Sequence, residues 1–345
     1  MTVLHERWFV DSSPFPVSWT SVTRPGTLVA TGGALVVFGL AFLLWRRTGR
    51  RPLVPGPFRL GADADSLAVL YGAIPLVLAL HLSITLFVSG VNLQLFAPNL
   101  RLGEGGPVPI GSMAGAIAAL AQIGIGLALF YGALTRFAAL ALVALWVGGV
   151  FHFGPLLLLE HAIVPGTALT LAITGRGPFA VDALLNPRLG LPRLRRLPHA
   201  LTPLRIGTGI SLVTLAFTEK LANLPLGLAF LERYPVNFLA AWGLPVSDET
   251  FLLVAGAVEL LIGLLLIGNV FTRLGIVLLW LPFNLTLAAF GWIEVVGHLP
   301  VYGAMAVLAL WGAGSAEDLR ALQRGLMQRP ALLPREPAPP HEGTA

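Results

Sequence analysis

One ionisable side chain lies in the middle of an apolar stretch, where a charge is costly to place. Glu259 stands in LLVAGAVELLIGLLLIG, with Gly256 and Gly263 on either side of it. A charged group at mid-membrane depth costs roughly 2.5–3.5 kcal/mol on insertion scales, so such residues face a bundle interior or a cavity. Residues three and four apart share a helix face, and glycines there allow close approach. We predict that Glu259 faces inward and is catalytic, the alternative being a protonated glutamic acid hydrogen-bonded between helices.

Lys220 is the second catalytic candidate. It follows Glu219 at the end of the apolar stretch 204–221, whose polar stripe consists of Thr208, Ser211, Thr214 and Thr218. Because neighbouring helices of one unit usually pack together, Lys220 and this stripe are the expected partners of Glu259. The alternative is that Glu219 and Lys220 form a solvated pair at the protein surface.

Four further residues are candidate ligand-binding groups: His81, Gln122, His161 and His298. His81 continues as a polar stripe through Thr85, Ser89 and Asn92, which indicates a face turned towards protein or water. For His161 and His298, the alternative is a structural histidine at the membrane interface that caps or hydrogen-bonds a loop. No CxxCH or HxxxH spacing occurs, so haem is disfavoured and no metal ligand set is predicted. The absence of cysteine excludes disulfides and cysteine-ligated clusters.

The composition places these residues in a membrane protein. The 345 residues are 56% hydrophobic and 11% charged, whereas soluble domains carry about 25% charged residues. We predict an all-α polytopic membrane protein, because backbone in lipid must satisfy its own hydrogen bonds. Helices of about 20 residues cross a bilayer, and nine stretches qualify: 27–45, 67–90, 110–132, 135–151, 153–174, 204–221, 250–270, 272–291 and 294–312.

Arginines give the orientation of these helices. They concentrate in 46–59, 176–196 and 320–335, which nine crossings place on one side of the bilayer. Cytoplasmic loops carry the excess of Lys and Arg, so we expect a cell (inner) membrane protein with its N-terminus outside and its C-terminus in the cytoplasm. The net charge of +5 is thereby assigned to topology rather than to nucleic-acid binding.

An internal duplication divides the chain. Residues 112–177 align without gaps on 249–314, with 17 of 66 positions identical. The matches include Thr135-Arg136 with Thr272-Arg273, His161 with His298, and Gly126 and Gly166 with Gly263 and Gly303; Gln122 matches Glu259. The predicted organisation is a tail, first helix and Arg-rich loop (1–66), two parallel four-helix repeats (67–178 and 204–315), a basic linker (179–203) and a C-terminal tail (316–345). An even helix count per repeat gives a symmetry axis along the membrane normal.

The second repeat resembles the DoxX-like family of four-helix membrane proteins. The matching residues are Arg205, Lys220, Gly243-Leu244-Pro245, Glu259, Gly263 and Thr272-Arg273. The first repeat keeps the Thr-Arg turn and the glycines, but it has Gln122 and no clear lysine. The resemblance implies a membrane protein that partners an oxidoreductase, since some members look like subunits of quinone-linked complexes. It carries over Lys220 and Glu259 as functional positions.

Three functions remain open at this stage. The first is a membrane subunit of a quinone-linked oxidoreductase system, with quinone as cofactor and a polar site around Glu259 in the outer half. The second is a small-solute transporter that uses the repeat interface. The third is a scaffold that anchors a soluble or membrane partner in the lipid bilayer. The sequence leaves open whether the protein is itself an enzyme.

Overall fold

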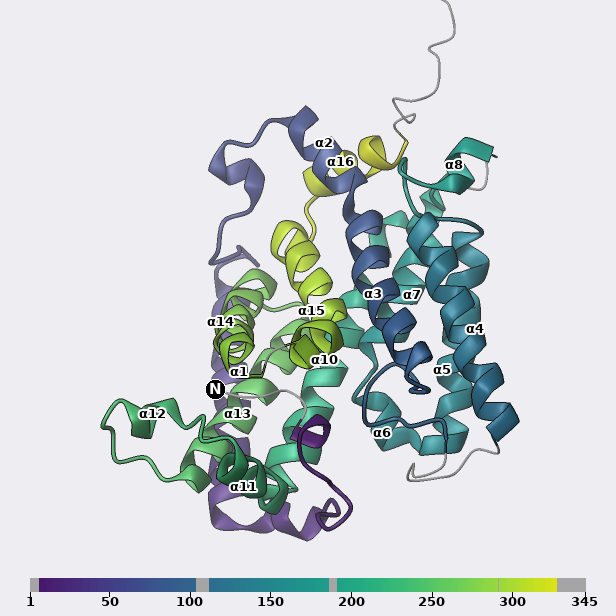
Figure 1. Cartoon of the computed structure of the whole chain (residues 1–345). Helices are drawn as coiled ribbons and strands as arrows, with labels where there is room; N and C mark the ends of the chain where they lie inside the picture. Colours follow the sequence, from purple (N-terminus) through teal and green to yellow (C-terminus); the bar gives the residue numbers. More distant parts are fainter. Residues whose placement is uncertain (1–5, 104–111, 186–190, 291, 328–345) are drawn as a thin grey trace, which may run out of the picture.

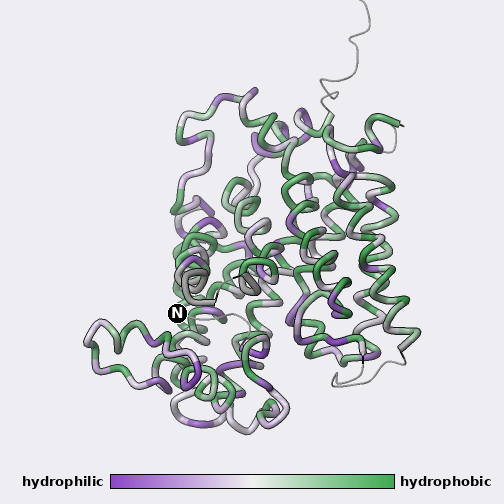
Figure 2. Tube along the Cα trace, viewed as in Figure 1, coloured by the Kyte–Doolittle hydropathy of each residue, from purple (hydrophilic) through white to green (hydrophobic). Residues whose placement is uncertain are grey.

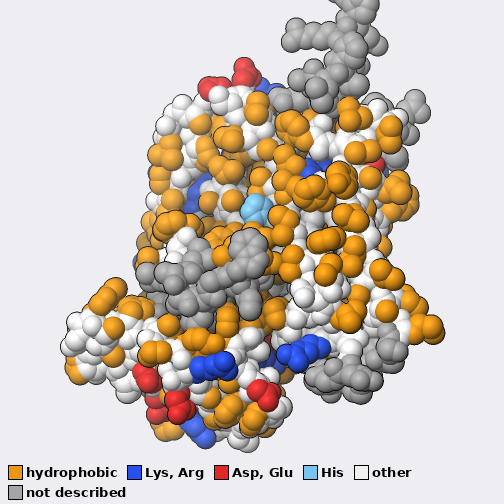
Figure 3. All heavy atoms as spheres, viewed as in Figure 1, with side chains coloured by type: hydrophobic (Ala, Val, Ile, Leu, Met, Phe, Trp, Pro, Cys, Tyr) orange, Lys and Arg blue, Asp and Glu red, His pale blue; other side chains and the backbone are white. Residues whose placement is uncertain are grey.

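The computed structural model describes residues 6–103, 112–185, 191–290 and 292–327. These residues form helices and no strand; an isolated bridge joins Gln94 to Arg101. Six helical segments are long and apolar enough to cross a membrane. Hydrophobic side chains cover most of the visible side of the bundle, and charged ones gather mainly towards its two ends (Figure 3). The all-α membrane architecture predicted from composition is therefore confirmed.

The main helices follow the predicted spans closely. Their bounds are α1 (Pro25–Arg47), α2 (Ala64–Gly72), α3 (Ile74–Val91), α4 (Ser112–Tyr131), α5 (Thr135–Phe153), α6 (Pro155–Leu159), α7 (Ile163–Thr174), α10 (Thr202–Leu215), α13 (Asp248–Gly268), α14 (Thr272–Phe290) and α15 (Trp292–Trp311). A π-helical turn, η5 (Ala216–Leu221), continues α10. In the predicted spans 153–174, 272–291 and 294–312, the apolar helical stretches found among the described residues are Ile163–Thr174, Thr272–Leu281 and Val295–Trp311, each of 10–17 residues. Nine crossings therefore stay a prediction.

Shorter elements close the two ends of the bundle. The segments η1 (Glu6–Trp8), α6, α11 (Leu224–Arg233) and α12 (Phe238–Ala241) lie at one end, called here the η1 end (Figure 1). The opposite end, the α16 end, carries α2, α8 (Val181–Leu185) and the amphipathic α16 (Ala316–Leu326), which packs on α2 (Figure 1). The segment 222–249 contains the short helices α11 and α12. Polar stretches of the chain lie mostly outside the central parts of the long helices (Figure 2).

The helices of the two proposed repeats pack in matching pairs. Helix α3 packs on α4 as α10 packs on α13, and α5 packs on α7 as α14 packs on α15. The two proposed repeats also contact each other in a matching way. Helix α10 of the second repeat packs on α7 of the first, and α3 of the first repeat packs on α15 of the second. Helix α1 lies outside this arrangement and contacts α13.

Glycines that match in sequence occupy matching helix crossings. A Cβ on Gly126 would lie 3.3 Å from the Ser83 carbonyl of α3, and one on Gly263 would lie 2.8 Å from the Gly209 carbonyl of α10. A Cβ on Gly166 would meet α10, 2.6 Å from the Pro203 carbonyl. One on Gly303 would meet His81 of α3 at 3.0 Å. Small residues let helix backbones approach closely inside membranes, and here they fix all four crossings.

The matching arginines also make matching hydrogen bonds. The Nε atom of Arg136 donates to the Ala172 carbonyl at 3.3 Å, and the Nε atom of Arg273 donates to the Ala309 carbonyl at 2.9 Å. Each arginine opens the third helix of its unit and binds the carbonyl end of the fourth. Free carbonyls at a helix end need such donors.

Replacing Gly166 by Ala should destabilise the protein. The new Cβ would press on backbone atoms of α10, which cannot rotate away, and overpacking of this kind costs about 1–3 kcal/mol. Gly148 is the control, because its Cβ would meet nothing within 4 Å. We expect a lower Tm for G166A than for G148A in detergent-purified protein. Equal Tm values would contradict the tight α7–α10 crossing.

Candidate functional site

Six charged side chains meet in the interior at the η1 end and are called here the charge cluster. They are Glu6, Arg7, Glu160, Glu219, Lys220 and Glu259. The side chains of Glu160 and Lys220 are 0% exposed, that of Glu259 is 4% and that of Arg7 is 10%. Burying charges is tolerated only where they are paired or protonated. The cluster is therefore the costliest feature of this interior.

Lys220 is the central cation of the cluster. Its Nζ lies 3.2 Å from a carboxylate oxygen of Glu259 and 3.5 Å from one of Glu6. Gly256 makes room for it on α13, since a Cβ there would lie 3.1 Å from the Lys220 Cβ. The π-helical turn widens the end of α10, and Thr218, Glu219 and Lys220 are all buried there. Such turns within α-helices occur frequently at functional sites.

The N-terminal segment supplies two members of the cluster. The Glu6 backbone N–H donates to Oε2 of Glu219 at 2.8 Å. The Arg7 guanidinium lies 3.4 Å from Glu160 and donates to the Thr218 carbonyl at 3.2 Å. The chain stays attached further on, because Asn223 donates to the Phe15 carbonyl at 2.9 Å. A segment that precedes α1 thus completes the buried site.

His161 and His298 lie next to the cluster. Both are buried and line one small cavity of about 30 Å³, together with Glu160, Trp8 and Thr85. A cavity needs about 10–15 Å³ to hold one water, so this one has room for bound water. Trp8 packs against the His298 ring, with 4.7 Å between ring centroids. The two histidines that match between the repeats are therefore brought to one place.

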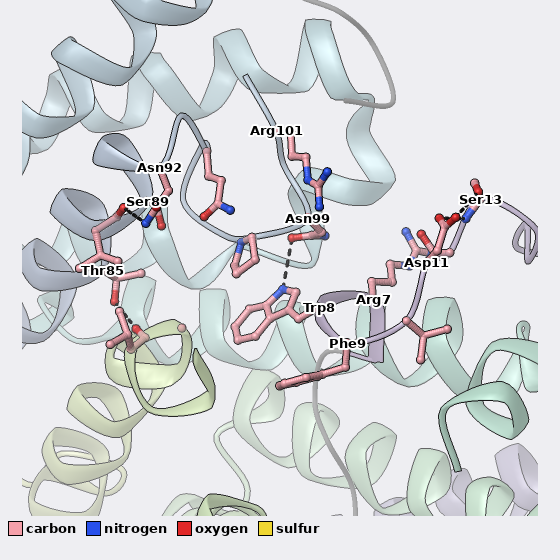
Figure 4. Close-up of a pocket in the computed structure, with 17 residues that line it drawn as sticks. Arg7, Trp8, Phe9, Asp11, Ser13, Thr85, Ser89, Asn92, Asn99 and Arg101 are labelled. Atoms are coloured by element: carbon pink, nitrogen blue, oxygen red, sulfur yellow. Dashed lines mark hydrogen bonds between the residues drawn. The ribbon is translucent and has the colours of Figure 1, made fainter. Parts of the chain in front are cut away.

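A much larger cavity, here called the vestibule, opens at the η1 end. It has a volume of about 1130 Å³ and lies between the N-terminal segment, the end of α3 and the chain that follows α3 (Figure 4). Arg7 and Trp8 line it. Since Arg7 also binds Glu160, the vestibule and the charge cluster share a wall.

The surroundings of Glu259, Glu219 and Lys220 bear on two predictions made from the sequence. The carboxyl of Glu259 faces the interior and pairs with Lys220, as predicted. The alternative of a solvated Glu219–Lys220 pair is wrong, because both residues are 0% exposed. Hydrophobic length placed them at the end of a span, but the N-terminal segment and α11 cover that end.

Gln122 and His81 have other partners. The Gln122 carbonyl accepts from the Phe96 N–H at 2.9 Å, and its amide donates to the carbonyls of Leu86 and Gln94. Gln122 thus holds the chain after α3. The Nδ1 atom of His81 lies 2.8 Å from the Val77 carbonyl of its own helix. Ligand binding by these two residues gains no support from the geometry.

Sequence reasoning did not assign Glu6 and Arg7 to the site. They lie more than 200 residues from Thr218 and Glu219 along the chain. The only signal was a charged pair in an N-terminal stretch with no span of its own. Within the part of the chain that the structure describes, no group of three or more His, Asp or Glu side chains has the arrangement of a metal site.

The chain was compared with protein-family models, curated proteins and solved structures, and none matched. The DoxX-like resemblance of the second repeat therefore stays an expectation from the quoted residues.

Glu6 lies outside the candidate membrane spans, and its protonation should affect stability. Burial raises the pKa of its carboxyl from 4.5 to about 7; Lys220 opposes this rise and Glu259 adds to it. Between these values the folded protein binds more protons at Glu6 than the unfolded chain does. The free energy of unfolding should therefore fall as the pH rises from about 4.5 to about 7.

Replacing Glu6 by Gln should flatten that slope, because the amide does not titrate. Thermal unfolding across this pH window, with the exposed Glu317→Gln variant as control, measures it. A slope unchanged in E6Q would show that other groups cause the pH dependence.

Lys220→Met should destabilise the protein more than Glu259→Gln. Removal of one partner of a buried ion pair costs about 3–5 kcal/mol, because it leaves the opposite charge uncompensated. Loss of Lys220 leaves Arg7 as the one described cation of the cluster beside four carboxylates, whereas E259Q removes one of the excess negative charges. The Tm values of both variants in detergent provide the measurement. If K220M unfolds at the higher temperature, Lys220 does not hold the cluster together.

Proposed function

We propose that the charge cluster is a proton-binding site, and that the protein is an integral membrane subunit of a quinone-linked oxidoreductase system. The observation that carries the proposal is the imbalance of buried charge. Within the part of the chain that the structure describes, four carboxylates, those of Glu6, Glu160, Glu219 and Glu259, face two cations, Arg7 and Lys220. With every group ionised, the cluster would hold a net charge of −2.

Such an excess is not sustained inside a membrane protein. An unpaired buried carboxylate takes up a proton rather than stay charged at low dielectric. Two protons therefore balance the cluster. A group of carboxylates that interact this closely releases its protons as a coupled unit. Quinone reduction consumes two protons and quinol oxidation releases two, so the stoichiometry of the cluster fits that chemistry.

An apolar groove supports the quinone part of the proposal. It lies between α1 and α13, has a volume of about 590 Å³, and is lined by residues such as Val29, Val37, Val254 and Leu261. A surface of this kind suits an isoprenoid chain. It runs along the helix that carries Glu259.

Transport of a small solute is the second candidate function. The observation that favours it is the vestibule, which shares Arg7 with the charge cluster. In this version, binding of a solute and protonation of the cluster would be coupled at the repeat interface.

The proposal includes two parallel four-helix repeats, nine crossings and an outward-facing η1 end. The paired helix crossings, the equivalent arginine bonds and the arginine asymmetry support it. Arg193 is exposed on the linker and serves as a test position. Labelling of an R193C variant by a membrane-impermeant reagent from outside the cell would contradict the orientation.

Glu259→Gln should abolish the response of the protein to quinone. Glu249→Gln is the matched control, since Glu249 is exposed on the same helix. We expect decylubiquinone to raise the Tm of the wild type and of E249Q, and to leave that of E259Q unchanged. We also expect infrared spectra to show a protonated-carboxyl band in the wild type that weakens in E259Q. Equal quinone responses in all three proteins would remove Glu259 from the site, and no response in any would favour transport.

A further inference from the structure

The vestibule is lined by an unusual surplus of hydrogen-bond donors. Arg7 and Arg101 contribute guanidinium groups, and Asn92, Gln94 and Asn99 contribute side-chain amides. Figure 4 shows Arg7, Asn92, Asn99 and Arg101 around the same space. The amide groups reach it because Gln122 fixes the chain after α3 through the backbone at Gln94 and Phe96.

Asp11 is the only acid among the lining residues that the structure describes, and its carboxylate already accepts hydrogen bonds. Its two oxygens accept from the Ser13 N–H at 3.0 Å and from the Ser13 hydroxyl at 2.9 Å. Among the described lining residues, the ionised groups are thus two arginines and one aspartate, a net charge of +1, and Arg7 also faces Glu160 at 3.4 Å behind this wall. Charge and hydrogen-bonding capacity both favour an anion in this space.

Two of the lining side chains have buried donors with no partner. The Nε of Arg7 and the Nδ2 of Asn99 are buried and make no hydrogen bond. The Asn99 side chain is held by its oxygen, which accepts from Nε1 of Trp8 at 3.2 Å. Buried donors without partners are rare, and each calls for an explanation such as an absent ligand or water.

The remaining wall is apolar. Trp8, Phe9, Val10 and Val88 line the vestibule beside the polar groups. Ligand sites usually combine apolar walls with a few convergent polar groups, within a volume of about 300–1,000 Å³. The vestibule, at about 1130 Å³, is of that order.

We propose that the vestibule binds a small organic anion, whose charged group contacts Arg7 and Arg101 and whose apolar part lies against Trp8 and Phe9. This site is separate from the groove between α1 and α13 and does not depend on the quinone proposal. Arg7 connects the vestibule to the charge cluster, because an anion at Arg7 competes with Glu160 for the same guanidinium.

The test uses benzoate, with benzyl alcohol as an uncharged molecule of similar size. Calorimetric titration of the detergent-purified full-length protein should give saturable binding of benzoate and none of benzyl alcohol. Arg101→Gln should weaken benzoate binding at least tenfold. Arg24→Gln is the control, since Arg24 is exposed at the start of α1 and does not line the vestibule.

Arg101 carries the test because it is exposed, and its replacement should leave the fold intact; Asn99→Ala provides a second variant. Arg101 lines the vestibule and is not part of the charge cluster, so failure of the quinone proposal would leave the R101Q result unaffected. The proposal is overturned if benzoate does not bind, if benzyl alcohol binds equally well, or if R101Q behaves like R24Q. Binding of phosphatidylglycerol without binding of benzoate would also overturn it, in favour of a lipid headgroup.

Discussion

The structure at the η1 end depends on the burial of one ammonium group. Lys220 has no exposed surface, and a charge in that position persists only if carboxylates reach it from several directions. Glu259 does so from α13 and Glu6 does so from the N-terminal segment. This requirement explains the π-helical turn at the end of α10, the glycine opposite Lys220, and the burial of the Glu6 carboxylate of the N-terminal segment.

The two halves of the bundle carry different polar residues, Gln122 and Glu259, at the same position of the alignment. In the first half, the neutral side chain of Gln122 makes three hydrogen bonds with nearby backbone groups. At the matching position, Glu259 is acidic and needs a cation, which Lys220 provides. A neutral amide can hold its own loop, while a carboxylate draws charged groups together. Lys220 and Glu259 both belong to the second repeat, whereas the cluster takes Glu160 from the first repeat and Glu6 and Arg7 from the N-terminal segment.

The vestibule and the groove between α1 and α13 differ in character. The vestibule combines polar groups with an apolar wall, has two arginines among its described lining residues, and shares Arg7 with the cluster. The groove between α1 and α13 is almost wholly apolar and lies along the helix of Glu259. Proton exchange in the cluster would alter the pairing of Arg7 and Lys220, and hence the charge presented to both spaces. Such an arrangement gives the proposed site a physical link between the aqueous and the lipid side.

The sequence alone determined the helical architecture, the position of the long apolar helices, the inward orientation of Glu259 and its pairing with Lys220. These follow from hydrophobic length and from the cost of a charge in lipid, both of which act locally along the chain. The tertiary structure decided which charges meet. Glu6 and Arg7 lie in a short polar stretch with no periodicity, and their partners are more than 200 residues away. Burial of Glu219 and Lys220 likewise depends on a covering segment, since the same two residues at an uncovered helix end would be solvated.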